Sequence, residues 1–189
     1  MNHRYLQKFQ IKDVVFLAIM SAVALATCAV MPLVISLQPL IFGISQLVTA
    51  LQISVFFAIG LYKVRKPGSL LLMALMMGLI QLMMSPPMFL SSVLNGVLIE
   101  LIVLLLFRGY EKDAAVFVAA MLHTPLSLPF NYLYNRLVKG TDSPLAAVAD
   151  RAPLAAVGMT LAVVAVSALG ALIGIKIARE LKKSGVLKK

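Results

Sequence analysis

The sequence predicts an all-α integral membrane protein, a single domain with six transmembrane helices and with both termini in the cytoplasm. Its composition is 61% hydrophobic and only 13% charged, and its mean hydropathy is +0.99, which lies outside the range of soluble globular proteins. Six apolar stretches follow one another, and each approaches the ~20 residues needed to cross a bilayer core. The basic residues fall on alternate connections between these stretches.

The predicted spans cover residues 14–30, 44–62, 69–85, 89–107, 114–134 and 153–178. Each boundary contains proline, glycine or charged residues, which break or terminate apolar helices. Pro67-Gly68 follows the second span, and Pro86-Pro87 separates the third span from the fourth. The remaining breaks lie at 31–44, 108–113 and 135–152.

The distribution of charge predicts the orientation of the helices. If the N-terminus is cytoplasmic, 14 of the 17 Lys and Arg residues lie inside, and only Arg136, Lys139 and Arg151 lie outside. That asymmetry is what the positive-inside rule requires. The net charge of +10 therefore reflects topology and attraction to anionic lipid head groups of the bilayer, and we expect no nucleic-acid partner.

Several classes of activity are not expected from this chain. Cys28 is the single cysteine, so one chain can form neither a disulfide framework nor a cysteine-based metal site. The spans leave no room in 189 residues for a nucleotide-binding or soluble catalytic domain, and no catalytic motif is visible. We expect no enzyme activity, cofactor or metal site, and active transport would draw energy from an ion gradient or from another subunit.

The first external segment, Met31–Gly43, is long and carries no charge. It contains Pro32 and Pro39, which oppose a continuous helix. An uncharged apolar loop is poorly suited to open water, so we expect it to fold over the helices as a lid or to lie in the membrane interface.

Small residues recur at helical spacing in two of the spans. Ala18, Ala22 and Ala26 lie four residues apart and therefore share one helix face. Small side chains let a second backbone approach closely in lipid, and this spacing leaves open both packing within the chain and docking of a separate subunit. Gly170 and Gly174 form a similar series in the last span, which we expect to pack within the chain.

Glu100 is the only carboxylate well inside a span, near the middle of the fourth helix, with Gly96 one turn away. A charge at the bilayer centre costs roughly 3 kcal/mol or more, so it normally faces a cavity or a partner. We predict a binding role for Glu100; a structural hydrogen bond from a protonated carboxyl group is the alternative.

His123 enters the fifth span at a depth similar to that of Glu100, and Pro125 and Pro129 follow it. Each proline removes a backbone donor, and a broken backbone in lipid is tolerated where it lines a polar cavity. We predict one externally facing pocket that contains Glu100 and His123. Its further substrate-binding residues are Asn131, Asn95, Gln81, Tyr132 and Tyr134.

Taken over its whole length, the chain resembles a substrate-binding S-component of an energy-coupling factor (ECF) type vitamin ABC transporter. The resemblance rests on about 190 residues, six spans with both termini inside, a long apolar loop after the first span, and the stripe Ala18, Ala22 and Ala26. It implies that this stripe docks on a transmembrane coupling subunit driven by two cytoplasmic ATPases, and that Met31–Gly43 closes over a pocket in the outer half. ATP would then be used by the partner subunits, and the ligand would be of vitamin type.

The resemblance also suggests a first candidate for the substrate. Thiamin-binding members of that family use a membrane Glu, a His and an Asn, which here correspond to Glu100, His123 and Asn131. This favours thiamin or its pyrimidine precursor. The chain has no tryptophan, so the stacking that those members obtain from indole would have to come from Tyr or Phe. Cobalamin, a queuosine precursor, riboflavin and haem remain open.

Two functions from other classes also fit the sequence. A stand-alone proton-coupled transporter or channel would use Glu100 as its proton carrier. A structural or assembly subunit would use the alanine stripe to dock a partner and would leave its pocket empty.

Overall fold

The structure, a computed structural model, describes residues 8–28, 34, 36–37, 40–138, 140 and 143–187, apart from the side chain of Leu145. Within these ranges it is all-helical, with seven helices and no strand. The helices are α1 (Ile11–Thr27), α3 (Ile44–Val64), α4 (Ser69–Leu82), α5 (Pro86–Phe107), α6 (Asp113–Leu137), α7 (Pro144–Arg151) and α8 (Pro153–Lys183).

Each of the six predicted spans coincides with one helix. Four helices, α3, α5, α6 and α8, are long and apolar enough to cross a membrane. The other two are shorter, with 17 residues in α1 and 14 in α4. The chain is therefore a helical membrane protein, whereas six crossings and the cytoplasmic position of the termini stay predictions.

Helix boundaries follow local sequence signals. Asp13 accepts a hydrogen bond from the backbone N–H of Gln10 at 3.1 Å, which closes a capping box at the start of α1. Prolines occupy the first turns of α5, α7 and α8, where the missing N–H costs nothing. Gly68 precedes α4 with a φ of 87°, a conformation that favours glycine.

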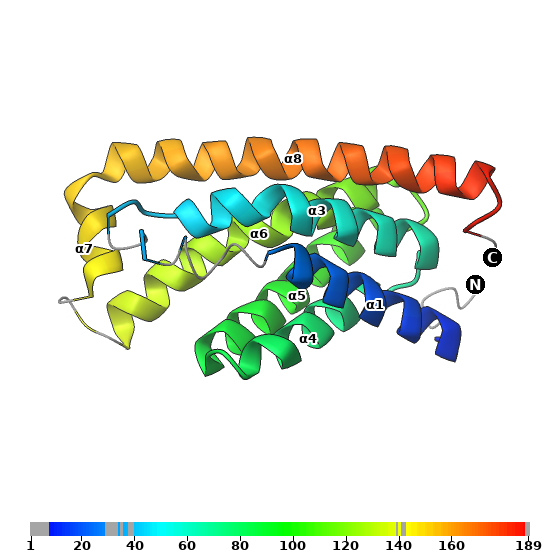
Figure 1. Cartoon of the computed structure of the whole chain (residues 1–189), viewed down its shortest axis with the longest axis horizontal. Coiled ribbons are helices and arrows are strands. Elements are labelled where there is room, and N and C mark those ends of the chain that lie inside the picture. The colour runs from blue at the N-terminus through cyan, green and yellow to red at the C-terminus, as the bar shows by residue number, and fades with distance from the viewer. Residues whose placement is uncertain are drawn as a thin grey trace.

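The two ends of the bundle differ in what they contain. The start of α1, the end of α8 and the connections 65–68 and 108–112 lie at one end, here called the basic end, and α7 lies at the other, the α7 end (Figure 1). The helix α7 was not predicted, since residues 135–152 were expected to form a loop. Six of the thirteen residues of the expected lid Met31–Gly43 lie outside the described residues.

Close backbone approach holds α8 against α3. A Cβ atom added to Gly170 would lie 2.6 Å from the carbonyl oxygen of Leu51, and one added to Gly174 would lie 2.5 Å from that of Val55. Only glycine fits such contacts. The glycine series of the last span therefore packs within the chain, as the sequence predicts.

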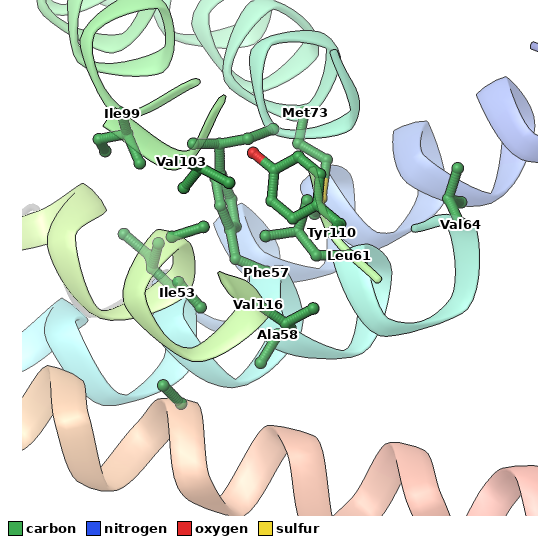
Figure 2. Packing of buried hydrophobic residues seen from close by; sticks show 14 of the residues in the cluster. Ile53, Phe57, Ala58, Leu61, Val64, Met73, Ile99, Val103, Tyr110 and Val116 are labelled. Atoms are coloured by element: carbon green, nitrogen blue, oxygen red, sulfur yellow. The ribbon is translucent and has the colours of Figure 1, made fainter. Parts of the chain in front are cut away.

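The main hydrophobic core lies between α3, α4, α5 and α6, toward the basic end. Figure 2 shows part of it, with Tyr110 among Leu61, Met73 and Val103. All four side chains are fully buried. This part of the bundle consists of buried, closely packed apolar side chains. It contrasts with the part that contains the candidate site.

Candidate ligand-binding site

A cavity of about 840 Å³ opens between α1, α3, α4, α5 and α6 in the half of the bundle nearer α7. Its size lies within the range of small-molecule sites. Apolar walls come from Ile53, Met77, Ile80, Met84 and Met88. Between them lie hydroxyl, amide and imidazole groups, so the cavity combines apolar surface with hydrogen-bonding groups.

Three buried side chains of the cavity wall present unpaired polar atoms. Both amide atoms of Asn95, both ring nitrogens of His123 and the hydroxyl oxygen of Thr124 have no hydrogen-bond partner among the described residues. Asn95 is 0% exposed, His123 4% and Thr124 3%. Buried polar groups in folded proteins are nearly always paired. Their clustering among the residues that line one cavity makes this cavity the candidate site for a polar ligand.

Helix α6 presents His123 and Thr124 to the cavity. The His123 ring packs against the buried ring of Phe57, with 4.4 Å between the ring centroids, which leaves its nitrogen atoms without a partner from α3. The helix continues through Pro125 and Pro129, although the sequence suggested a broken backbone. The carbonyl groups four residues before each proline nevertheless lose their usual donors.

Asn95 is held on α5 by the packing of α5 against α4. Ser92, one turn before it, donates from its hydroxyl group to the carbonyl oxygen of Ala74 at 2.9 Å. Gly96 meets the same residue, because an added Cβ atom would lie 2.6 Å from that of Ala74. The role of Gly96 is therefore close packing of α5 against α4.

Five of the seven predicted substrate-binding residues line this cavity, and two do not. The five are Gln81, Asn95, His123, Asn131 and Tyr134. Tyr132 points instead toward α7, where its hydroxyl group donates to Asp150 at 2.7 Å. Neighbouring positions on a helix face different sides, so Tyr132 and Tyr134 could not both be placed from the sequence.

Glu100 lies apart from the cavity, near the basic end. One carboxylate oxygen accepts from the backbone N–H of Gly68 at 2.6 Å, and the other accepts from the Tyr110 hydroxyl group at 2.9 Å. Since Gly68 is the N-cap of α4, the carboxyl group sits at the positive end of a helix dipole. The expectation that Glu100 and His123 share a pocket therefore differs from the geometry, because Glu100 lies beyond Asn95 toward the basic end of α5.

The hydrogen bonds of Glu100 connect three segments of the chain at the basic end. Burial raises the pKa of Tyr110 well above its usual value, and the neighbouring Glu100 raises it further. The hydroxyl group therefore stays protonated and serves as a donor. This single buried carboxyl group links α5, the start of α4 and the connection 108–112.

Ion pairs at the surface of the basic end add further links. Asp113 at the start of α6 pairs with Arg65 after α3 and with Arg179 on α8. Asp13 on α1 pairs with Lys66 at 2.6 Å. Partial burial raises the pKa of Asp13, but hydrogen bonds from Lys66 and from the Gln10 backbone outweigh it and hold the pKa below its usual value.

The alanine stripe lies at an open edge of α1. Ala18 is half-buried, while Ala22 and Ala26 are exposed. Ala22 and Ala26 also line the cavity, whereas Ala18 does not. A partner that packs on this stripe would therefore contact the helix that forms one wall of the cavity.

Several lining residues were missed by sequence reasoning. They include Thr124 and Ser127 on α6, and Ser45 and Thr49 on α3. A signal was present, because positions 124, 127, 131 and 134 recur at three to four residues and so form one polar stripe on α6. A single Ser or Thr is a weak signal, because its hydroxyl group is often satisfied by its own helix.

The donors in the cavity suit an organic ligand. Among the described residues, no three His, Cys, Asp or Glu side chains come together as metal ligands would. What the cavity offers is a set of uncharged hydrogen-bond donors and acceptors between apolar walls. Such a set can hold and orient a small molecule.

One comparison with known proteins gives a match. A family model described as "Hypothetical bacterial integral membrane protein (Trep_Strep)" matches residues 11–183. No curated protein and no solved structure matches the chain. The family match covers all seven helices, and four of these can cross a membrane. The chain therefore belongs to the Trep_Strep family of bacterial integral membrane proteins.

Proposed function

We propose that this chain is the substrate-binding S-component of an ECF-type transporter. It would bind a vitamin or cofactor precursor on the outside and dock on a transmembrane coupling subunit driven by two cytoplasmic ATPases. The observation that carries the proposal is the cavity of about 840 Å³. Its lining includes Asn95, His123 and Thr124, whose buried polar atoms have no hydrogen-bond partner among the described residues.

The position of the cavity supports uptake from outside. Its lining residues belong to the halves of the helices away from the connections 65–68 and 108–112, and Figure 1 shows these connections at the opposite end from α7. By the positive-inside rule, the basic end faces the cytoplasm. The cavity then opens toward the external side, while the cytoplasmic end is closed by the Glu100 and Asp113 contacts.

The stand-alone proton-coupled alternative gains no support from the position of Glu100. A proton carrier needs contact with the transport path, and both oxygens of Glu100 bond to groups of the basic end instead. The alternative of a structural subunit predicts an empty cavity, so it is an outcome of the binding experiment.

Binding is tested by purifying the full chain in mild detergent and identifying co-purifying small molecules by mass spectrometry, followed by titration. We expect a bound vitamin or precursor with a Kd near 1 nM, which corresponds to about −12 kcal/mol. Asn95→Leu should abolish that binding. A cavity that binds nothing across a vitamin panel would contradict the proposal and favour the structural role.

Docking is tested separately by co-purification with coupling and ATPase subunits from the same organism. Ala18 is the cleanest position, since Ala22 and Ala26 also line the cavity. Ala18→Leu should remove co-purification and keep ligand binding, because a bulky side chain prevents close helix approach. If Ala18→Leu and Asn95→Leu each lost both properties, docking and binding would not be separate functions of the two helices.

A further inference from the structure

We propose that the ligand of this cavity carries no net charge and that its polar edge contains both hydrogen-bond donors and acceptors. This inference rests on the proposed function and narrows the class of substrate. It excludes thiamin, whose thiazolium ring is a permanent cation, and haem, whose propionates are anionic. Riboflavin and the pyrimidine precursor of thiamin remain compatible with this inference.

The first observation is the absence of charge from the cavity wall. No Asp, Glu, Lys or Arg occurs among the described residues that line it. The sequence extends this finding, because the segments 14–62, 69–99 and 114–135 contain none of these residues at all. These segments include every part of α1, α3, α4, α5 and α6 that lines the cavity.

The described charged groups near the α7 end are engaged elsewhere. Arg136 on α6 pairs with Asp150 on α7, and Asp150 also accepts a hydrogen bond from Tyr132. Arg151 is exposed and does not line the cavity. An ionised ligand in the cavity would therefore lose water without gaining an opposite charge from the described residues, which is unfavourable in a membrane interior.

The second observation is the mixed character of the unpaired groups. The Asn95 amide offers an acceptor oxygen and an NH₂ donor, a neutral imidazole at His123 offers one donor and one acceptor, and the Thr124 hydroxyl group offers both. A ligand edge that alternates donor and acceptor, such as a cyclic amide or an aminopyrimidine, satisfies this set. The methionines of α4 and α5 then contact its apolar faces.

The test compares pairs of probes that differ in charge. Riboflavin is compared with its 5′-phosphate, nicotinamide with nicotinate, and the hydroxymethyl aminopyrimidine with thiamin, each titrated against the purified full chain at pH 7. The molecule extracted from the protein is identified in parallel. We expect the extracted molecule to be uncharged, and any neutral probe that binds to do so at least about 100-fold more tightly than its charged partner.

Two other results have distinct meanings. A charged molecule bound in the cavity, or a charged probe that binds as tightly as its neutral partner, overturns the inference and leaves the proposed function standing. Loss of that binding in Asp142→Asn or Lys139→Ala would identify the missing counter-charge, since both residues lie outside the described ranges. No extracted molecule and no bound probe overturns the proposed function itself.

A matched pair of variants assigns the binding to this cavity. Thr124→Val removes an unpaired hydroxyl group from the wall, and Ser167→Ala removes an equally unpaired hydroxyl group on α8, outside the cavity. Thr124→Val should weaken binding of the neutral ligand about tenfold or more, and Ser167→Ala should leave it unchanged. Equal effects of the two variants would place the ligand elsewhere and overturn the inference.

Discussion

Two sets of buried polar groups in this bundle differ in their hydrogen bonding: Glu100 with its partners at the basic end, and the polar side chains of the cavity toward the α7 end. At the basic end, both oxygens of Glu100 are paired and Asp113 bridges two arginines. Toward the α7 end, Asn95, His123 and Thr124 are just as buried but have no partner among the described residues. Paired groups stabilise a fold, whereas unpaired groups cost free energy that binding can recover.

This difference in hydrogen bonding implies different roles for the two ends of the bundle. The basic end fixes the relative positions of the helices through contacts between segments distant in sequence. Under the proposed function, the unpaired groups toward the α7 end give up stability for a surface that recognises a ligand, which is a common relation between function and stability. Four experiments, each based on substitutions, test this contrast and are given in order of decreasing expected effect.

The largest effect is expected at Glu100. Glu100→Ala leaves the Gly68 N–H and the Tyr110 hydroxyl group buried without partners, and each unpaired group costs about 1–3 kcal/mol. We expect the free energy of unfolding, measured by denaturant titration in detergent, to fall by about 3 kcal/mol. The control is Glu180→Ala, whose ion pair with Lys183 is exposed, and it should change little. Equal effects would show that the Glu100 contacts do not hold the basic end.

The next effect is expected where α8 approaches α3. An added side chain at Gly174 meets the backbone of Val55, whereas one at Gly158, near the α7 end, meets nothing within 4 Å. Gly174→Leu should lower the free energy of unfolding by about 1–3 kcal/mol because the helices must separate. Gly158→Leu is the matched control on the same helix. Because Leu has the higher helix propensity, a destabilisation by Gly158→Leu as large as that by Gly174→Leu would mean that close approach of α8 to α3 does not set the effect.

A gain in stability is expected in the cavity. Asn95→Leu replaces unpaired polar atoms with an apolar side chain of similar size, which should raise the free energy of unfolding of the ligand-free protein by up to about 1 kcal/mol. Ser92 lines the same cavity but its hydroxyl group is paired with Ala74, so Ser92→Ala should instead lower it by about 1 kcal/mol. Thermal unfolding of the ligand-free protein measures both changes in stability. A loss of stability in Asn95→Leu would indicate that the Asn95 amide has hydrogen-bond partners in the folded protein.

The smallest effect is expected from pH at Asp13. Because its pKa in the folded protein is lowered, the Asp13–Lys66 pair contributes stability above the usual aspartate pKa of about 4, and that contribution is lost as the pH falls through the lowered value. The contribution should be at most about 1 kcal/mol. Comparing wild type with Asp13→Asn between pH 3 and pH 7 measures it. A difference in the free energy of unfolding between wild type and Asp13→Asn that grew as the pH fell would contradict this prediction.

The sequence predicted the helices well and the site in part. Long apolar stretches and charged connections identify membrane helices in a sequence, so the six helical segments appear where they were expected. The polar residues that follow His123 along the chain were expected in one pocket with it, and His123, Asn131 and Tyr134 do line the same cavity. Glu100 was misplaced because hydropathy gives the depth of a residue only roughly, and its partners Gly68 and Tyr110 come from connections whose path depends on tertiary packing.

Helix orientation about its own axis was also beyond the sequence. Tyr132 and Tyr134 lie two residues apart and face different surroundings, and only the packing of α6 against α5 and α8 decides which one faces the cavity. The same holds for Gly96, which faces α4. A pattern of polar residues gives a face, but the neighbouring helices determine what that face contacts.

The short helix α4 has a consequence for the surrounding lipid. At 1.5 Å per residue, its 14 residues reach about 21 Å and the 31 residues of α8 reach about 46 Å, while a hydrocarbon core measures about 30 Å. The turn after α4 exposes Met83 and Met84, which belong among acyl chains. Hydrophobic mismatch on this side must thin the leaflet or tilt the protein. We therefore expect bilayer thickness to influence how easily a ligand reaches the cavity.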